Sequence, residues 1–408
     1  MHTNTSPPRL ALPEFIALMA MLAAIVAFAI DAMLPAMPRI AAELSPADPN
    51  RAQLILSSFV LGMGLGTFFA GPLSDSFGRK PLIFGGAILY AIGAALAWIA
   101  PTLELVLLGR VVQGLGAAGP RIVSIALVRD LYAGRQMARI MSFVMMIFTL
   151  VPAMAPLVGS LIIDVTGWRG IFGAFILFVA LVMVWFMTRQ PETLPPAART
   201  PFRAGPMLAA MREVMGNRIA LIAIAMQSLL FGALFGMLAQ IQGLFDQTFH
   251  KGAEFPLYFA GIALFSGCAS LLNAQLVIRL GMRRLLKWAL VLQVTLSAAV
   301  AGLLMFELAP PAMAFALFLT WIGGVFFTVG LTLGNINAIA MEPLGHIAGM
   351  AASLIAAIAT VAGVVVAVPL GLAFDGTILP LSCGVAVLGG LALVLQHFLP
   401  PGKETARH

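Results

Sequence analysis

Charged residues are scarce in this sequence. They make up 10% of the 408 residues, whereas hydrophobic residues make up 61%. A soluble domain is typically about a quarter charged and about half apolar. Water is therefore not the main solvent of this chain. The composition predicts an all-α membrane protein, because lipid leaves unpaired backbone groups without a partner and the alternating pattern of a membrane β-barrel is absent.

Residues that would support enzymatic or metal chemistry are also few. A membrane enzyme would need a cluster of metal ligands or a Ser/His/Asp set, and the five histidines are too scattered to supply one. They are His2, His250, His346, His397 and His408. No Gly-x-x-x-x-Gly-Lys-Ser/Thr loop is present, which argues against a primary pump in this chain. The two cysteines, Cys268 and Cys383, fall inside apolar runs, so a structural disulfide is not expected. The sequence thus predicts no enzyme, no metal and no cofactor.

Long apolar stretches are abundant. A helix needs roughly 20 mostly apolar residues to cross the hydrocarbon of a bilayer. Twelve such stretches occur, which predicts twelve transmembrane helices. We place them at 13–36, 52–72, 82–100, 103–127, 139–163, 169–187, 219–245, 255–278, 285–307, 311–336, 346–370 and 374–398. The first apolar run is too long for the core of a signal peptide, and we interpret it as a permanent span.

The longest connector divides the spans into two groups of six. It covers residues 188–217 and is rich in Pro and Arg. We predict an N-terminal six-helix half at 1–187, a cytoplasmic linker at 188–217 and a C-terminal six-helix half at 218–408. The turns at 75–80 and 278–284 form a weak repeat, because each combines a glycine with basic residues. Two such halves around a central cavity are a recurrent plan of secondary transporters, which we favour over channels and membrane enzymes.

The basic residues are distributed unevenly between the two predicted membrane faces. Of the 23 Lys and Arg, two lie inside a span (Arg110 and Arg121) and four in loops on one face (Arg39, Arg51, Arg169 and Lys251). The remaining 17 lie on the face that carries both termini. Cytoplasmic loops are the ones that carry excess Lys and Arg. We therefore expect a multi-pass protein of the bacterial inner membrane with both termini in the cytoplasm. The same asymmetry explains the excess of basic over acidic residues, so we expect no nucleic-acid partner.

Asp31 is the only one of the 16 acidic residues that lies well inside a predicted span. A carboxylate there is costly, which indicates a functional group; the alternative is an acid at a helix end that reaches the headgroups. Arg110 enters span 4 at a similar depth, roughly 8 to 10 Å at 1.5 Å per residue. A direct or water-bridged pair is thus feasible. Arginine keeps its proton, whereas a carboxylate can exchange one, so we predict that Asp31 carries the proton and Arg110 biases its charge.

One face of span 4 is unusually polar. Arg110, Gln113, Gly114, Ala117 and Arg121 recur at helical spacing and share that face. We expect the face to line the central cavity, because exposing it to lipid would be costly. For Arg121, the alternative is a buried ion pair or a bond to helix carbonyls.

The second half offers its own cavity candidates. The polar ones are Gln227, Asn273, Asn335, Asn337 and His346, each of which could instead form hydrogen bonds between helices. Phe231 and Phe235 are one turn apart, so they could stack on an aromatic substrate or simply pack.

Several motifs resemble those of one transporter family. Residues 71–81 read Gly-Pro-Leu-Ser-Asp-Ser-Phe-Gly-Arg-Lys-Pro and fit the loop signature G-x-x-x-D-x-x-G-R-K/R-P. Residues 108–117, around Arg110, resemble the motif of span 4, and residues 31–38 resemble the D-x-Y-L-P-x-x-P ending of span 1, with Met33 in place of Tyr. Over nearly its whole length the chain resembles the major facilitator superfamily, in particular the Bcr/CflA-type drug:proton antiporters that confer bicyclomycin or florfenicol resistance.

The antiporter motif of span 5 is present in a Bcr-like form. It covers residues 151–159 and includes Pro152, Pro156 and Gly159, with Ala155 where the wider pattern has Gly. Residues 346–353 are similar to the Bcr-type start of span 11. The resemblance implies a major facilitator fold and proton-driven export of small drug-like molecules, with Arg110 in proton coupling. It implies no cofactor, since the proton gradient supplies the energy. The expected partners are a small-molecule substrate, protons and the lipid bilayer, and we expect a monomer.

The loop signature predicts a cytoplasmic latch built from Gly71, Asp75, Gly78, Arg79 and Asp130. Arg79 can reach Asp130 at the end of span 4, and Asp75 can cap the positive end of a helix from the other half. Alternatively, the basic residues of this loop only reflect the excess of Lys and Arg that cytoplasmic loops carry. A rival to drug export is a dedicated exporter or importer of a small metabolite such as an amino acid, because two arginines in span 4 would suit an anionic substrate.

Overall fold

The computed structural model describes residues 10–308 and 310–400. Arg9, Lys403 and Arg407, three of the basic residues that we assign to the cytoplasmic face, lie outside these residues, as do His2 and His408. Within the described residues, twelve helices are long and apolar enough to span a membrane, which confirms the number of predicted spans.

Each half contributes six of these helices. The first half contains α1 (Leu12–Asp31), α3 (Leu54–Phe77), α4 (Arg79–Trp98), α5 (Leu103–Leu131), α6 (Gly134–Thr166) and α7 (Gly170–Arg189). The second contains α9 (Arg218–Gly243), α10 (Phe255–Leu280), α11 (Met282–Met305), α12 (Pro311–Met341), α13 (Ala348–Leu372) and α14 (Leu379–His397). Short helices connect them: η1 (Leu34–Ala36), α2 (Met37–Leu44), η2 (Pro49–Gln53), η3 (Pro196–Ala198), α8 (Ala204–Gly216), η4 (Leu244–Thr248), η5 (Gly252–Glu254) and η6 (Gly345–Ile347).

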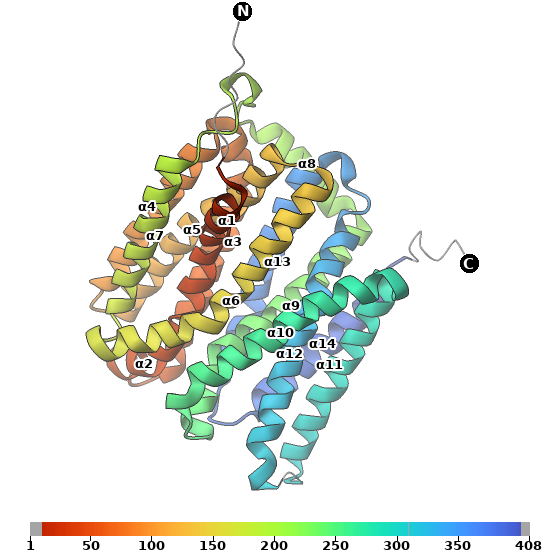
Figure 1. Cartoon of the computed structure of the whole chain (residues 1–408). Coiled ribbons are helices and arrows are strands. Elements are labelled where there is room, and N and C mark those ends of the chain that lie inside the picture. The colour runs from red at the N-terminus through yellow and green to blue at the C-terminus, as the bar shows by residue number, and fades with distance from the viewer. Residues whose placement is uncertain (1–9, 309, 401–408) are drawn as a thin grey trace, which may run out of the picture.

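The two halves pack against each other along two pairs of helices, α3 with α13 and α6 with α10. Figure 1 shows α6 and α10 at the front of the bundle, with α13 and α3 behind them. The described start of α1, the turn between α3 and α4, and α8 lie at one end of the bundle, which we name the linker end. Helix α2 lies toward the opposite end.

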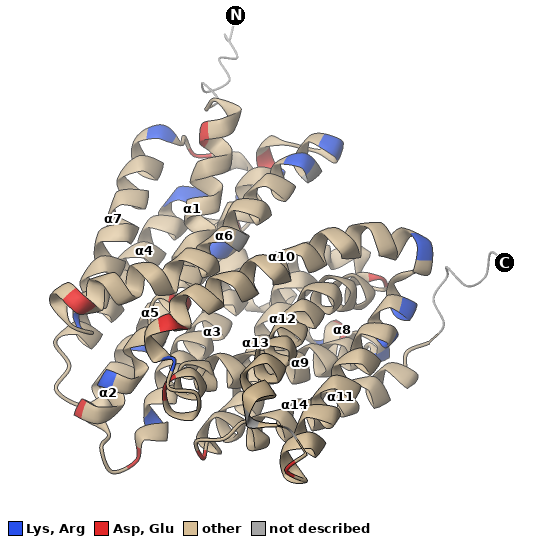
Figure 2. Ribbon diagram, turned by 60° about the horizontal axis from the view of Figure 1, so that its bottom comes forward, with Lys and Arg blue, Asp and Glu red and all other residues tan. Residues whose placement is uncertain are grey.

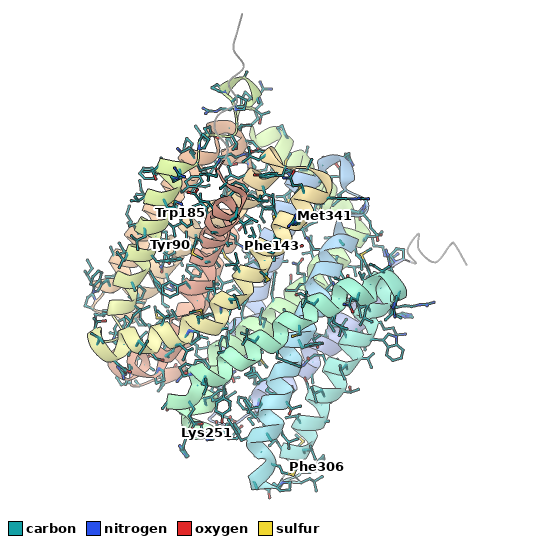
Figure 3. All side chains as sticks on the ribbon, viewed as in Figure 1. Tyr90, Phe143, Trp185, Lys251, Phe306 and Met341 are labelled. Atoms are coloured by element: carbon teal, nitrogen blue, oxygen red, sulfur yellow. The ribbon has the colours of Figure 1, made fainter. Side chains whose placement is uncertain are left out.

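Charged residues follow this arrangement. In Figure 2 most Lys, Arg, Asp and Glu positions lie toward the two ends of the helices, and the middle of the bundle is largely uncharged. Figure 3 places Trp185 and Met341 toward the linker end and Lys251 and Phe306 at the opposite end. The helices therefore run in alternating directions between two polar rims, as a bilayer requires.

Glycine allows helices α3 and α5 to pack very closely. A Cβ atom on Gly62 would lie 2.0 Å from the Val111 carbonyl oxygen, and one on Gly114 would lie 2.0 Å from the Phe59 carbonyl oxygen. Small residues at helix interfaces are the usual means of such close approach in membranes. This contact brings the backbone of α3 against the polar face of α5.

The first span differs from the sequence-based expectation. The first span does not leave the bundle near Ala36: α1 ends at Asp31, and the chain continues through η1 into α2. Pro35 and Pro38 lie at these breaks, because proline cannot donate the hydrogen bonds of a continuing helix. The linker predicted at 188–217 contains the 13-residue helix α8.

Candidate functional site

Arg110 is a fully buried scaffold residue. Its guanidinium donates hydrogen bonds to the Ala29 carbonyl of α1 (2.9 Å), the Ile55 carbonyl of α3 (3.3 Å) and the Gln113 side-chain oxygen (2.7 Å). The exposed fraction of Arg110 is 0%, and its guanidinium lies 4.3 Å from the centre of the Phe59 ring. The planar fork of arginine suits three acceptors in different directions. Arg110 thus ties α1 and α3 to α5.

Asp31 lies at the last residue of α1, two residues after the carbonyl that accepts from Arg110. Its exposed fraction is 6%, and among the described residues it has no ion-pair or hydrogen-bond partner. The direct pair with Arg110 that the sequence made feasible is therefore not formed. Asp31 is also not an acid that reaches the headgroups, since η1 and α2 continue beyond it.

Helix α6 touches the backbone immediately after Asp31. A Cβ atom on Gly159 would lie 2.2 Å from the Ala32 carbonyl oxygen, so only glycine fits there without movement. Pro156 lies one turn earlier in the same helix and Pro152 two turns earlier. The predicted antiporter motif is thus placed against the break in span 1.

The polar face of α5 lines a cavity only at one end, which corrects the sequence-based expectation. Arg110, Gln113 and Ala117 each have an exposed fraction of 0%, and Gly114 packs on the backbone of Phe59. Helical periodicity identified the shared face correctly, but α1 and α3 cover it. Arg121, at the end of this face, belongs to the lining of a pocket.

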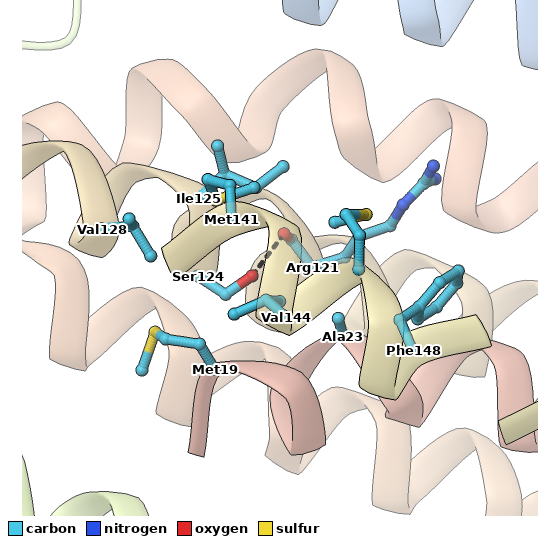
Figure 4. Close-up of a pocket in the computed structure, with 10 residues that line it drawn as sticks. Met19, Ala23, Arg121, Ser124, Ile125, Val128, Met141, Val144 and Phe148 are labelled. Atoms are coloured by element: carbon cyan, nitrogen blue, oxygen red, sulfur yellow. Dashed lines mark hydrogen bonds between the residues drawn. The ribbon is translucent and has the colours of Figure 1, made fainter. Parts of the chain in front are cut away.

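The pocket lies within the N-terminal half, between α1, α5 and α6, and has a volume of about 130 Å³. Its lining is mostly apolar and rich in methionine: Met19, Ala23, Arg121, Ser124, Ile125, Val128, Met141, Val144, Met145 and Phe148. Figure 4 shows the Arg121 guanidinium extending away from Met19 and Val128, on the side where Phe148 lies. The Ser124 hydroxyl donates to the Arg121 carbonyl at 2.8 Å. Arg121 is therefore the charged group of this pocket.

Most second-half candidates pack between helices instead of lining this pocket. Phe231 and Phe235 stack on each other with ring centres 5.4 Å apart, and Gly363 of α13 lies against Phe231. Asn335 donates to Asn273 at 2.7 Å and to the Leu331 carbonyl at 2.8 Å. These contacts match the packing and hydrogen-bonding alternatives.

Three further candidates of the second half are also outside the pocket. Gln227 is buried in α9, Asn337 is exposed on α12, and neither belongs to the pocket lining. His346 lies at the linker end, where its ring pairs with Glu213 of α8 at 2.7 Å. Its side chain is 63% exposed, so the expectation of a cavity residue is wrong. The reason is that η6 precedes the span helix α13, and the helical linker lies beside it.

The predicted latch residues form a charged cluster at the linker end. Arg79 Nε donates to Asp130 at 2.9 Å, and the Arg79 side chain is only 5% exposed. Asp75 does not cap a helix of the other half but pairs with Arg79 one turn away. Gly78 adopts φ +105°, a conformation that favours glycine, and Gly71 packs on Ser353 of α13.

The cap of α4 comes from the linker. The Glu192 carboxylate accepts backbone hydrogen bonds from Arg79 (3.1 Å) and Lys80 (2.9 Å), at the positive end of that helix. Next to it, the Thr193 hydroxyl donates to Asp130 at 2.9 Å. The linker thus binds the cluster of the first half. Sequence reasoning missed Glu192, although an acid inside the Pro-rich connector was a visible signal.

At the opposite end, one amide ties the two halves together. The Asn50 side chain in η2 donates to the carbonyls of Leu372 (3.1 Å) and Phe374 (2.7 Å) at the end of α13. Helix α9 also contacts η1 and α2 there. The halves are therefore joined beyond Asp31, on the side away from the linker. No sequence pattern pointed to Asn50, because its partners are backbone groups distant in sequence.

Three comparisons place this architecture among known proteins. The family model described as Major Facilitator Superfamily matches residues 19–367. A bicyclomycin resistance protein homolog of Haemophilus influenzae is 30% identical over 363 residues, which cover 86% of this chain and 87% of that protein. The multidrug resistance protein MdtL of Escherichia fergusonii is 27% identical over 385 residues, covering 93% and 94%. A solved D-xylose-proton symporter shares the fold, with a TM-score of 0.76, 15% identity, and coverage of 96% and 98%.

Proposed function

Because this chain belongs to the Major Facilitator Superfamily of transporters, we propose that it is a proton-coupled antiporter that exports small drug-like molecules, including antibiotics, across the bacterial inner membrane. The family consists of transporters, not enzymes, and needs no cofactor. The names of the two curated relatives support drug export as the direction and class of transport.

One observation carries the proposal: Asp31 is a buried acid at the break in span 1, and no residue that the structure describes pairs with it. The other acids of α1, α5 and α6 all pair with arginines, namely Glu14 with Arg189, Glu104 with Arg51, Asp130 with Arg79 and Asp164 with Arg39. A paired carboxylate is held in its charged form, whereas an unpaired one in low dielectric is free to change its charge state. Asp31 is thus the group that is suited to take up and release a proton.

Arg110 supports this role through the backbone and through its charge. Its bond to Ala29 holds the last turn of α1, on which Asp31 lies, against α3 and α5. The guanidinium stays protonated, so it provides a fixed positive charge. This charge is bonded to the Ala29 carbonyl, two residues before Asp31 in α1. We propose that Arg110 compensates the charge of Asp31 after proton release.

The transport cycle that we propose alternates between two openings. The linker end faces the cytoplasm, in line with the excess of basic residues there. Drug enters the N-terminal pocket from that side, and a periplasmic proton taken by Asp31 drives its release. Opening to the periplasm requires the Asn50 bonds to break and the halves to rock, as in other two-repeat transporters.

Everted membrane vesicles test this proposal. Vesicles with the wild-type chain are expected to accumulate a drug such as a phenicol when a proton gradient is imposed, and a protonophore should stop the accumulation. Asp31→Asn should abolish it, while Asp48→Asn, the same change in an exposed loop, should retain it. Equal accumulation by the wild type and Asp31→Asn would refute the assignment of the proton carrier.

A second candidate function is transport of a small acidic metabolite, which the unpaired Arg121 favours. A panel of drugs and amino acids in the same vesicles separates the two functions. Drug accumulation supports the exporter, and transport of amino acids alone supports the metabolite transporter.

A further inference from the structure

Arg121 is a cation within a transmembrane helix that has no acidic partner. Its nearest polar contact is the sulfur of Met63, 3.3 Å from Nη1, and thioether sulfur is a weak acceptor. Among the described residues Arg121 forms no ion pair. An uncompensated charge within the membrane is costly and usually marks a functional site.

Among the described residues, the helices around the pocket supply no free acid at the level of Arg121. The helices around the pocket carry Asp31 and four acids that already pair with other arginines. Asp31 lies near the level of Arg110, which bonds the same turn of α1. Eleven residues separate Arg110 from Arg121, or about 16 Å along α5 at 1.5 Å per residue. A counter-ion for Arg121 must therefore come from a ligand.

The shape and lining of the pocket indicate the rest of that ligand. A cavity of about 150 Å³ lined by apolar side chains accepts a benzene ring, and this pocket has about 130 Å³. Met19, Met141 and Met145 supply flexible side chains that adapt to different shapes. Arginine, with its planar fork of donors, binds carboxylate, sulfonate or phosphate groups best.

We propose that the pocket recognises organic anions with a ring-sized apolar body, and that Arg121 binds their acidic group. Arg121 contacts Met63, and the neighbouring Gly64 packs on Val361 and Thr360 of α13. The acidic group therefore lies beside the seam between the two halves, where rocking of the halves changes its surroundings. This inference rests on the proposed export function and adds a preference, among its substrates, for compounds with one acidic group.

A matched pair of probes tests the inference. 4-Toluenesulfonate and 4-toluenesulfonamide have nearly the same shape, but only the sulfonate carries a charge at neutral pH. We would measure their binding by calorimetry to the full-length protein in nanodiscs of phosphatidylcholine. The wild type should bind the sulfonate at least tenfold more tightly than the sulfonamide. Arg121→Gln should weaken sulfonate binding at least tenfold and leave sulfonamide binding within twofold, which also reports an intact pocket. Arg121→Lys should retain part of the preference.

Several outcomes would overturn the inference. They are equal binding of the two probes by the wild type, absence of sulfonate binding, or full sulfonate binding by Arg121→Gln. A lipid headgroup is another source of the same anionic chemistry, so the titration is repeated with phosphatidylglycerol in the nanodiscs. Loss of sulfonate binding there would assign the pocket to a headgroup instead of a substrate.

The proposed export function can fail separately. Proton-driven, Asp31-dependent export of neutral drugs without any preference for the sulfonate would refute only the role of Arg121. Arg121-dependent sulfonate binding without proton-driven export of any compound would refute only the antiporter function.

Discussion

The replacement Arg110→Lys tests whether Arg110 is the scaffold of the proton site. It keeps the positive charge but loses the planar guanidinium, which donates hydrogen bonds to Ala29, Ile55 and Gln113. A lysine side chain ends in one compact ammonium group, which can donate to about one of these three acceptors. A hydrogen bond to a charged group contributes roughly 1.5–3 kcal/mol, so losing two should lower the free energy of unfolding by about 3–6 kcal/mol.

The expected loss is large enough to measure as a change in melting temperature. In a domain the size of one half, 1 kcal/mol corresponds to roughly 2–4 °C, so a fall of about 6–24 °C is expected for Arg110→Lys. Thermal unfolding of the detergent-solubilised protein, followed by tryptophan fluorescence, measures it. Arg121→Lys is the matched control on the same helix, because Arg121 contacts only a sulfur, and it should cost less than about 1 kcal/mol. Equal melting temperatures of the two variants would refute the scaffold role.

Three more replacements or conditions probe other parts of the account. Gly159→Ala should impair export, because its Cβ would lie 2.2 Å from the Ala32 carbonyl oxygen. The control Gly261→Ala on α10, which has open space around it, should leave export unchanged. Uptake into everted vesicles compares the two variants, and equal activity would contradict the packing argument. Glu192→Ala removes the cap of α4 and should lower the free energy of unfolding by about 0.5–2 kcal/mol. The control Glu213→Gln, in an exposed pair, should lower it by less than about 1 kcal/mol, and thermal unfolding measures both. An inside-negative potential should accelerate export of a monovalent anion more than export of a neutral drug. Exchange of the anion for one proton moves two charges across the membrane, worth about 4.6 kcal/mol per 100 mV, whereas exchange of the neutral drug moves one charge, worth about 2.3 kcal/mol. Equal acceleration in proteoliposomes with a potassium diffusion potential would contradict an anionic substrate.

The sequence predicted those features that depend on local pattern. Twelve apolar runs of the right length gave the twelve spans, because each helix satisfies its own backbone in lipid. The contact between Arg79 and Asp130 was also foreseen, since the loop signature and the end of span 4 must meet at the same membrane face.

Features that depend on how closely helices pack were not predictable in the same way. Periodicity placed Arg110 and Arg121 on one face of α5, yet one is covered and the other reaches a pocket. The difference arises from Gly62 and Gly114, which bring α3 against only part of that face. Glu192 and Asn50 were missed because their partners are backbone groups that residue types do not reveal. The methionines of the pocket look like any other apolar residues in the sequence.

Proton release on ligand binding tests the role of Asp31 most directly. The purified protein in lightly buffered detergent solution receives a saturating dose of a transported drug, and a pH indicator records the protons that leave. Protons should be released from the wild type and from Asp48→Asn, and none from Asp31→Asn that still binds the drug. Equal release from Asp31→Asn and the wild type would contradict the claim that this buried carboxyl exchanges the proton.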